Sequence, residues 1–514
     1  MSFSKVYSAQ TIALTVNTIS VETDISRGLY AFSIVGLPDK AVEEARDRVS
    51  AAIKNSGFTS PKSKNQKIVI SLAPASEKKE GASFDTAIAL SYLVSSEEIH
   101  FDPEGKIFLG ELSLDGTLRP VRGVLPISRF AKEKGFKELY VPLENAEEAA
   151  IISGIDIYGV KTLKDLLSHL EGTKKIALSN QTVLERPETS SLVDFSDVRG
   201  QERAKRGLLI AAAGGHNVAM YGPPGTGKTM LAKAFAGILP PLSFEESLDA
   251  TSIHSVAGVL SGFVTEPPFR APHHTSSYVS LVGGGTTPKP GEITLAHRGV
   301  LFMDEFPEFE RRVIESLRQP LEDKVISVAR AKGTARFPAD VMLVAAMNPC
   351  PCGNYGFRGK PCICTPTSLQ RYRRKMSGPI IDRIDIWLEV DRILPSELSG
   401  SEEGAKSVYF RNLVADARNI QRARFNSSMQ GGGEKNTLSR NAEMSARDLV
   451  NFIDLGPEAK ATLNLAAERL GFSPRVYHRM LKVARTIADL DNSPEISRDH
   501  ILEAVEYRPK KFDV

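Results

Sequence analysis

The stretch that decides the fold of this chain runs from Asn217 to Leu239. It reads Asn217-Val-Ala-Met-Tyr221, then Gly222-Pro-Pro-Gly-Thr-Gly-Lys-Thr229, then Met230-Leu-Ala-Lys-Ala-Phe-Ala-Gly-Ile-Leu239. The first segment predicts a short buried strand, and the last predicts a helix that ends before Pro240-Pro241. The middle segment has the form G-x-x-x-x-G-K-S/T, which cradles phosphates when it joins a strand to a helix. The sequence therefore predicts an α/β domain that binds a nucleoside triphosphate.

Each part of this phosphate-binding loop has an expected role. The glycines let the backbone curl so that its N–H groups point at the phosphates, and the helix N-terminus adds its positive dipole end. Lys228 is expected to reach the β- and γ-phosphates, and the Thr229 hydroxyl is expected to bind Mg²⁺. The predicted nucleotide-binding residues are Gly222, Pro223, Pro224, Gly225, Thr226, Gly227, Lys228 and Thr229.

A second segment, Gly299-Val-Leu-Phe-Met-Asp-Glu305, supplies the carboxylates for hydrolysis. It predicts an apolar strand that ends in two acidic residues. Asp304 is expected to hold Mg²⁺, directly or through water, and Glu305 to polarise the attacking water. The alternative is a glycine turn before an ordinary helix, with an unrelated acidic strand end. The agreement of all the motif positions with their flanking elements favours binding and hydrolysis of a nucleoside triphosphate.

Composition limits the class of protein. The chain has 514 residues, so we expect about three domains, and its 41% hydrophobic and 25% charged residues are typical of a soluble globular protein. The net charge of +3 indicates no global field for nucleic acid, so such a contact would be a local patch. The N-terminal residues predict no signal peptide, and no apolar run is long enough to span a membrane. We expect a cytoplasmic protein with reduced thiols and no membrane partner.

The chain divides into several expected parts. Residues 1–170 alternate short strands with helices and predict an α/β unit, and the polar residues 171–195 predict a linker. Residues 196–391 are expected to form the nucleotide-binding core. Residues 392–441 are expected to be a flexible connector, with mobile segments around Ser396–Lys406 and Gly431–Gly433. The remaining residues, 442–514, predict a helical unit in which Ser473-Pro474 opens a helix that runs to Asp489.

All four cysteines fall within fifteen residues, in the pattern C-x-C-x₉-C-x-C. A disulfide framework is not expected in a reducing compartment, and four thiolates suit tetrahedral Zn²⁺. The one-residue spacing is tighter than usual, and four unconnected thiols are the alternative. A four-cysteine site leaves no open position, so we expect a structural zinc knuckle within residues 350–364. Its predicted ligands are Cys350, Cys352, Cys362 and Cys364.

Three further residues resemble elements of the AAA+ ATPases. Asn348 ends the apolar strand Val341-Met-Leu-Val-Ala-Ala-Met-Asn348, where that superfamily has a sensor of the γ-phosphate. Ser377-Gly-Pro-Ile-Ile-Asp-Arg-Ile-Asp385 resembles the segment that carries the arginine finger, so the resemblance implies that Arg383 stabilises transition-state charge on a neighbouring subunit's nucleotide. Ser473-Pro-Arg475 resembles the second sensor, in which Arg475 would contact the γ-phosphate.

Each of these residues also has a plainer interpretation. Asn348 could cap a strand. Arg383 could form a surface ion pair with Asp382 or Asp385. Arg475 could be a solvated helix residue, and Arg479, one turn later, is its rival as the sensor.

The segment from Phe269-Arg-Ala-Pro-His-His-Thr275 to Gly299 closely resembles the YifB/ComM family of magnesium-chelatase-like AAA+ proteins. Ile34–Val49 and Arg479–Asp489 carry the same resemblance, which covers nearly the whole chain. It implies ATP and Mg²⁺ as ligands, an insertion that projects toward a central pore, and a homo-oligomeric ring, usually a hexamer. The adjacent His273 and His274 lack further metal ligands at suitable spacing, so we expect them to be structural.

The N-terminal residues resemble the Lon protease domain, which shares the fold of a ribosomal-protein domain. The resemblance rests on Glu80–Leu90 and on Gly110–Gly123. Lon uses a serine–lysine dyad. Here Ser83 falls near the nucleophile position, but Leu125 occupies the position of the lysine, and Lys78 and Lys79 lie elsewhere. We therefore expect a non-proteolytic module that binds DNA or supports the ring.

The function implied by the family is an ATP-driven hexameric motor on single-stranded or branched DNA. ComM is implicated in promoting branch migration of DNA during natural transformation, so we expect a helicase of homologous recombination. The alternative is an ATPase that remodels a protein or inserts a metal, as magnesium chelatase does. The basic residues Arg358, Lys360 and Arg371–Lys375 would meet DNA phosphates or form a solvated helix face.

Overall fold

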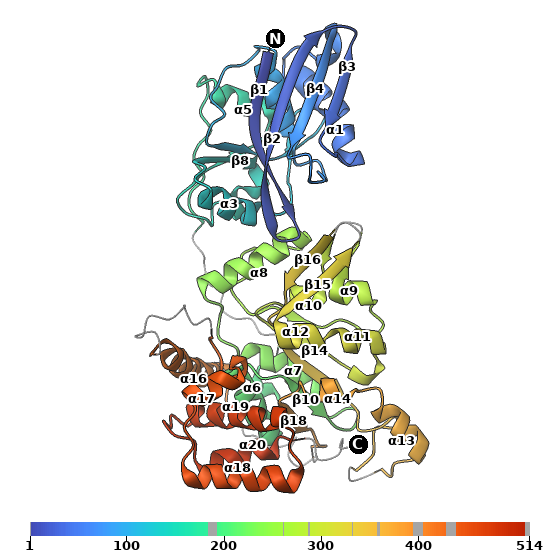
Figure 1. Cartoon of the computed structure of the whole chain (residues 1–514), viewed down its shortest axis with the longest axis vertical. Helices are drawn as coiled ribbons and strands as arrows, with labels where there is room; N and C mark the ends of the chain where they lie inside the picture. Colours follow the sequence, from blue (N-terminus) through green and yellow to red (C-terminus); the bar gives the residue numbers. More distant parts are fainter. Residues whose placement is uncertain are drawn as a thin grey trace. The chain divides into compact units, whose positions relative to one another are not determined.

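The computed structural model describes residues 2–182, 193–260, 262–285, 288–330, 333–356, 360–393, 404–427 and 438–508. It is an α/β protein of two compact units (Figure 1). The first unit comprises residues 1–186 together with Thr251–Phe263, and the second comprises residues 187–250 and 264–514. In the part of the chain that is described, no helix is both long and apolar enough to cross a membrane.

The first unit is built on a four-stranded sheet in the order β1-β2-β4-β3. Strands β1, β2 and β4 are antiparallel, and β3 runs parallel to β4. In β4 the apolar residues Ile68, Ile70 and Leu72 alternate with more exposed ones and are fully buried, which is the period expected of a half-buried strand. The strands are β1 (Ser2–Ile12), β2 (Thr15–Arg27), β3 (Ala31–Val35) and β4 (Gln66–Ala73).

Helices α1 and α2 supply much of the apolar core under this sheet. Val49 and Ile53 of α1, and Ile88 of α2, are fully buried in one cluster with the sheet residues. A parallel sheet β5-β8-β9 and a small pair β6-β7 complete the unit. The elements are α1 (Lys40–Asn55), α2 (Asp85–Ser95), β5 (Lys106–Phe108), β6 (Glu111–Leu112), β7 (Leu118–Arg119), α3 (Val124–Glu133), β8 (Glu138–Pro142), α4 (Ala146–Ala149), β9 (Asp156–Val160) and α5 (Leu163–Leu170).

The second unit contains a parallel five-stranded sheet in the order β11-β14-β17-β10-β18. Every residue of β10, β14 and β17 is buried, as expected for central strands of a parallel sheet covered on both faces. The strands are β10 (Val218–Tyr221), β11 (Phe269–Arg270), β14 (Val300–Met303), β17 (Met342–Met347) and β18 (Ile386–Glu389).

Shorter elements decorate this sheet. A hairpin of β15 (Val325–Arg330) and β16 (Gly333–Pro338) follows two short helices, α11 (Arg311–Ser316) and α12 (Arg318–Asp323). The remaining elements up to β18 are α6 (Glu202–Gly214), α7 (Lys228–Gly237), α8 (Phe244–Ala257), α9 (Tyr278–Val282), β12 (Gly283–Gly284), β13 (Lys289–Pro290), α10 (Glu292–Leu295), α13 (Pro366–Arg373) and α14 (Gly378–Ile381). The residues of α8 from Thr251 onward belong to the first unit.

The C-terminal helices share one hydrophobic core with this sheet. Val344 and Leu388 of the sheet lie in the same buried cluster as Ile487 and Ile501 of the helices. In Figure 1 these helices, coloured orange to red, gather around α6. They are α17 (Ala446–Phe452), α18 (Pro457–Leu470), α19 (Pro474–Leu490) and α20 (Arg498–Glu506).

The expected flexible connector, residues 392–441, differs from the structure. It contains a 21-residue helix, α16 (Ser407–Ser427). Val414, Ala417 and Phe425 of α16 are buried in the core of the unit, because the helix packs an apolar stripe against α6 and α19. The polar segments on either side hid this stripe. The expected mobile segments lie largely outside the described residues, as do residues 183–192 of the expected linker at 171–195.

Candidate nucleotide-binding and hydrolysis site

The phosphate-binding loop joins the carboxyl end of β10 to the first residue of α7. Gly227 precedes α7 with φ +89°, a conformation that favours glycine. A Cβ atom at Gly227 would meet no atom within 4 Å, so backbone conformation rather than crowding selects glycine here. The loop therefore leaves open space in front of the N-terminus of α7, where backbone N–H groups can receive phosphate oxygens.

Lys228 lies folded over this loop and is only 8% exposed. Its Nζ donates hydrogen bonds to the carbonyl oxygens of Gly222 and Pro223, both at 2.8 Å, and lies 3.4 Å from Oδ1 of Asn348. Burial lowers the pKa of Lys228. Its hydrogen-bond acceptors among the described residues are neutral oxygens, and a buried ammonium of this kind suits a multiply charged anion such as a triphosphate.

Thr229 and Asp304 meet at the carboxyl ends of the parallel strands. The Thr229 hydroxyl donates to Oδ2 of Asp304 at 2.7 Å. Strand pairing explains the meeting, because Tyr221 of β10 and Met303 of β14 both pair with residues near the end of β17. A hydroxyl and a carboxylate are the oxygen ligands that Mg²⁺ prefers, so these two residues fit that ion.

Glu305 follows Asp304 in a left-handed conformation, with φ +52°. Such a conformation is uncommon for a residue with a side chain and is concentrated at functional sites. Its Oε2 lies 3.0 Å from Nδ1 of His274. The His274 ring in turn packs against His273, with 4.2 Å between the ring centroids, and edge-on against Phe309.

Sequence reasoning missed this contact between His274 and Glu305. It assigned His274 a structural role because no metal ligand lies at suitable spacing. The tertiary signal is the pairing of β11 with β14, which brings the residues after Arg270 beside the end of the strand that carries Asp304. A two-residue strand such as β11 leaves no period in the sequence, so the pattern alone did not reveal it.

Asn348 lies at the end of β17, between β14 and β10. Its backbone oxygen accepts a hydrogen bond from the hydroxyl of Tyr372, at 3.0 Å, and Tyr372 is buried on α13. Asn348, the predicted sensor, therefore lies beside Lys228, and the hydrogen bond from Tyr372 of α13 holds its backbone. Tyr372 lies within the basic run Arg371–Lys375, but its side chain is buried and is not part of the exposed face of that run.

Arg383 lies at the amino ends of the parallel strands, whereas the phosphate-binding loop lies at their carboxyl ends. The first residue of β18, Ile386, pairs with Val218 at the amino end of β10, and the carbonyl oxygen of Arg383 accepts from Nδ2 of Asn217 at 2.9 Å. A four-residue strand such as β10 spans about 13 Å. The guanidinium of Arg383 forms an ion pair with Glu322, rather than with Asp382 or Asp385.

Arg475 is brought to the same place, since its Nη2 lies 3.1 Å from Oε1 of Glu322. Its rival Arg479 lies 3.1 Å from Oδ1 of Asp385 and is largely buried. Burial opposes ionisation of Asp385, but the hydrogen bond from His216 and the charge of Arg479 lower the pKa of the carboxyl to about 2. Arg479 therefore belongs to a buried ion pair, and Arg475 is the more exposed of the two.

The four cysteine sulfur atoms form one cluster, all within 4.8 Å of one another. The Sγ of Cys350 lies 3.4 Å from that of Cys352 and 3.7 Å from that of Cys362. A tetrahedral zinc ion with Zn–S bonds of 2.3 Å requires sulfur–sulfur distances of about 3.8 Å, so this donor set fits. Burial opposes formation of the Cys352 thiolate, but backbone N–H groups of Asn354 and Ile363 outweigh it and lower the pKa to about 6.

This cysteine cluster borders the phosphate-binding loop. A Cβ atom at Gly353 would lie 2.5 Å from Cδ of Pro224, so the two backbones approach closely only because residue 353 is glycine. Of the basic residues nearby, Arg373 covers the Tyr355 ring and Lys375 pairs with Glu308 at 2.7 Å. Arg371 and Lys360 are exposed, and Arg358 lies outside the described residues.

No serine–lysine dyad is formed by the candidates in the first unit. Leu125 is buried on α3. The ammonium of Lys79 is also buried and donates to the carbonyl oxygens of Pro74 and Glu77. The ammonium of Lys78 pairs with Glu80 at 2.7 Å, so neither lysine is given to Ser83 as a base.

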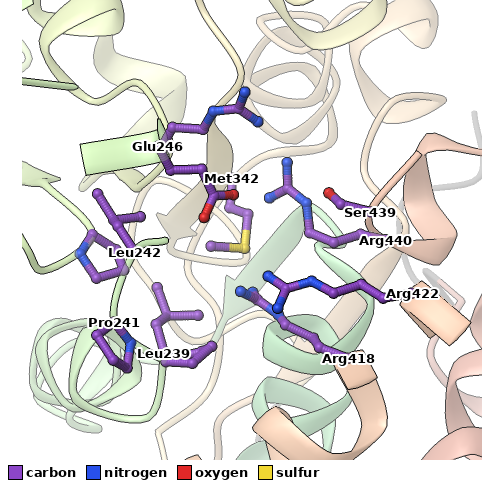
Figure 2. A pocket seen from close by; sticks show the side chains of 12 residues that line it. Leu239, Pro241, Leu242, Glu246, Met342, Arg418, Arg422, Ser439 and Arg440 are labelled. Atoms are coloured by element: carbon purple, nitrogen blue, oxygen red, sulfur yellow. The ribbon is translucent and has the colours of Figure 1, made fainter. Parts of the chain in front are cut away.

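Figure 2 shows a small cavity in the second unit. Met342 opens β17 and lines it, whereas Asn348 follows the other end of that strand. Arg418 of α16 and Arg440, which lies before α17, point into it. Its position at the amino ends of the strands separates it from Lys228.

Comparison with known proteins gives the family. The model for magnesium chelatase subunit ChlI matches residues 194–398, a second ChlI model matches 21–145, and the ChlI C-terminal model matches 404–508. Competence protein ComM of Haemophilus influenzae is 40% identical over 99% of this chain and 98% of its own length. The chain belongs to the YifB/ComM family of magnesium-chelatase-like AAA+ ATPases.

Two further relatives, one similar to ComM in identity and one more distant, also match the chain. The uncharacterized protein YifB of Escherichia coli is 41% identical over 99% of this chain and 97% of its own length. The DNA replication licensing factor Mcm6 of Anopheles gambiae is 23% identical over 66% of this chain and 40% of its own length. The family implies ATP and Mg²⁺ as ligands of this chain.

Proposed function

We propose that this chain is the subunit of a hexameric ring that hydrolyses ATP to move DNA, a helicase that promotes branch migration in homologous recombination and natural transformation. One observation carries the ring. Lys228 and Asp304 lie at the carboxyl ends of the parallel strands, and Arg383 lies at their amino ends. Arg383 therefore cannot serve the nucleotide of its own subunit, and a complete site needs a second copy of the chain.

In this mechanism the loop N–H groups and Lys228 hold the β- and γ-phosphates. Thr229 and Asp304 would hold Mg²⁺, which neutralises phosphate charge when it is bound. Glu305 takes a proton from the attacking water, and Asn348 orients that water. The oxygen of the water forms a bond to the γ-phosphorus as the bond to the leaving ADP oxygen breaks. Arg383 of the neighbouring subunit stabilises the charge that develops. Arg475 lies on the same carboxylate, Glu322, as Arg383, so in this proposal it acts from the neighbouring subunit as well.

The DNA substrate is supported by the names of the relatives. One is a competence protein and another is a DNA replication licensing factor. In this proposal the segment with α9 and β12–β13 faces the pore of the ring, and exposed basic residues such as Arg371 contact phosphates. The first unit is a non-proteolytic module that binds DNA or supports the ring.

The second candidate is an ATPase that remodels a protein or inserts a metal. It is favoured by the family models, all three of which describe a magnesium chelatase subunit. In both candidates Cys350, Cys352, Cys362 and Cys364 hold a structural Zn²⁺ that fixes the loop against Pro224.

The experiment that separates the candidates is steady-state ATP hydrolysis by the purified protein at two salt concentrations. The rate is measured without DNA and with single strands, duplex and four-way junctions. The DNA motor predicts stimulation by single-stranded or branched DNA that weakens as salt rises, because phosphate contacts release counterions. A rate that no DNA changes, in a protein that forms rings, would favour the remodelling ATPase.

A further inference from the structure

A single carboxylate holds both arginines that the proposed function assigns to the neighbouring subunit. Glu322 lies on α12 and its side chain is half exposed. Its Oε2 accepts from Nη2 of Arg383, and its Oε1 accepts from Nη2 of Arg475 at 3.1 Å. Among the described residues, no other carboxylate lies within ion-pair distance of either guanidinium. Glu322 therefore joins the segment before β18 to the first turn of α19.

The pairing turns Arg383 inward. Its side chain is only 11% exposed, and its Nη1 donates to the carbonyl oxygen of Pro379 at 2.8 Å. Its Nε is buried without a hydrogen-bond partner in the described part of the chain. An arginine in this position cannot reach a phosphate on another subunit unless it leaves Glu322. Arg475 is 52% exposed and is held at its tip alone.

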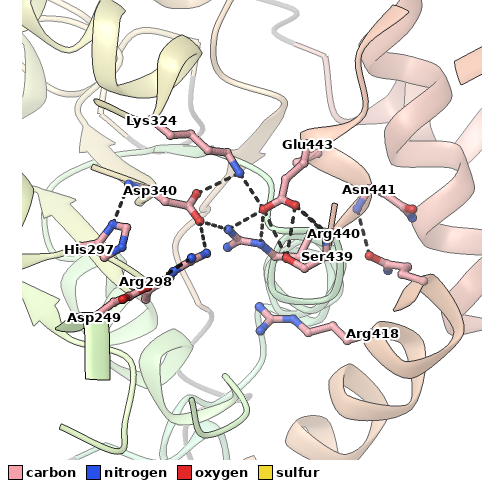
Figure 3. Close-up of polar contacts among 12 residues, drawn as sticks. Asp249, His297, Arg298, Lys324, Asp340, Arg418, Ser439, Arg440, Asn441 and Glu443 are labelled. Atoms are coloured by element: carbon pink, nitrogen blue, oxygen red, sulfur yellow. Dashed lines mark hydrogen bonds and ion pairs between the residues drawn. The ribbon is translucent and has the colours of Figure 1, made fainter. Parts of the chain in front are cut away.

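The helix that carries Glu322 is itself anchored. Lys324, which caps α12, lies 3.2 Å from Oδ1 of Asp340 and 2.6 Å from Oε1 of Glu443 (Figure 3). Arg440 bridges the same two carboxylates, at 2.5 Å and 2.8 Å. These contacts tie the end of α12 to Asp340, two residues before β17, and to the segment of Arg440 and Glu443 that precedes α17. The next residue, Val325, opens the β15–β16 hairpin.

We propose that Glu322 is a positioning residue that withholds Arg383 and Arg475 from the neighbouring subunit until the phosphates of that subunit's ATP displace its carboxylate. This inference rests on the proposed function of the two arginines in the ring. A terminal phosphate carries more negative charge than a carboxylate and has three acceptor oxygens, so it competes for the guanidinium groups. Because α12 leads directly into the β15–β16 hairpin, a shift of that hairpin would move Glu322 and change the competition.

The test compares four variants in the full-length ring: Glu322→Gln, Asp323→Asn, Arg383→Ala and the double variant Glu322→Gln/Arg383→Ala. Asp323→Asn is the matched control, because it removes one exposed carboxylate from the same helix and Asp323 contacts neither arginine. For each variant, kcat and KM for ATP are measured with and without single-stranded DNA. Ring formation and thermal unfolding are measured on the same samples.

Glu322→Gln should raise the DNA-free kcat about three- to tenfold, the range of one ordinary hydrogen bond, since Glu322 is half exposed to water. KM should change less than about twofold, since the neighbouring subunit's own loop binds ATP. Asp323→Asn should match the wild type, and the double variant should be as inactive as Arg383→Ala. Glu322→Asp, whose shorter side chain cannot hold both arginines, should also raise kcat and covers the case in which Glu322→Gln does not fold.

An unchanged or lower kcat in a folded, ring-forming Glu322→Gln or Glu322→Asp variant would overturn the restraint by Glu322. Full activity of Arg383→Ala is a separate result, because it would instead overturn the role of Arg383 in the ring. The two failures are thus distinguished by the single variants.

Discussion

At the scale of single residues, Lys228 and Glu305 have separable tasks. Lys228 is buried against carbonyl oxygens that a phosphate would replace. Glu305 follows Asp304 in the chain and contacts His274 rather than the phosphate-binding loop. Lys228→Ala should therefore abolish ATP binding, and Glu305→Gln should keep binding but lower kcat by at least about a hundredfold. Equilibrium binding of a fluorescent ATP analogue and phosphate-release assays measure the two effects. Retained turnover in either variant would refute the assignment of the site.

His274 is predicted to orient the carboxylate of Glu305. Its Nδ1 lies 3.0 Å from that carboxylate, and loss of the ring would free Glu305 to adopt other rotamers. His274→Ala should lower kcat about tenfold with little change in KM for ATP, since the imidazole contacts neither the loop nor Lys228. His273→Ala is the control, because His273 bonds to Thr275 and should have a smaller effect. Equal losses in both variants would indicate a general disturbance of the segment.

His297 should make stability depend on pH. Burial lowers its pKa to about 4, and its Nδ1 accepts a hydrogen bond from the backbone N–H of Asp340 at 3.0 Å, which requires an unprotonated nitrogen. Below pH 6.5 His297 becomes protonated in the unfolded chain, whereas in the folded chain it stays neutral down to about pH 4. The folded state should therefore lose up to about 3 kcal/mol relative to the unfolded state as pH falls from 6.5 to 4.

The measurement for His297 is thermal unfolding across this pH range. His297→Asn keeps an acceptor for the Asp340 N–H but cannot be protonated, so its melting temperature should fall less steeply than that of the wild type. Parallel curves for the two proteins would contradict the prediction.

At the scale of elements, the cysteine cluster is predicted to support the phosphate-binding loop. The wild type should contain about one zinc ion per chain, and Cys352→Ser should contain less because a four-thiolate site loses a ligand. The close approach of Gly353 to Pro224 should then relax and lower ATP affinity. Elemental analysis and ATP titration measure the two effects. Wild-type protein without zinc would refute the knuckle.

Helix α16 shows why an element can escape sequence analysis. It lies between polar segments rich in glycine and serine, so the composition of the whole region favours a connector. Burial is conferred by α6 and α19, which come from distant parts of the chain. In contrast, α19 has Ser473 as an N-cap that accepts from the N–H of Val476, and proline at its first position, so its start was predictable.

At the scale of the whole molecule, a site shared between subunits predicts complementation. Lys228→Ala lacks a working nucleotide site but keeps Arg383, and Arg383→Ala has the opposite defect. In rings formed from an equal mixture, about a quarter of the interfaces should combine an intact Lys228 with an intact Arg383. ATPase activity should therefore rise on mixing toward about a quarter of the wild-type rate. Mixed rings no more active than either variant would contradict a shared site.

The sequence by itself determined the α/β class, the phosphate-binding loop and the grouping of the four cysteines, because each depends on residues close together in the chain. Local spacing is enough to specify a glycine-rich turn, a helix cap or a cluster of thiols. Only the tertiary structure decided that Arg383 and Lys228 lie at opposite ends of the parallel strands. It also decided that Glu322 holds Arg383 and Arg475 together and that His274 contacts Glu305. These relations depend on strand order and helix packing, which join residues tens to more than a hundred positions apart.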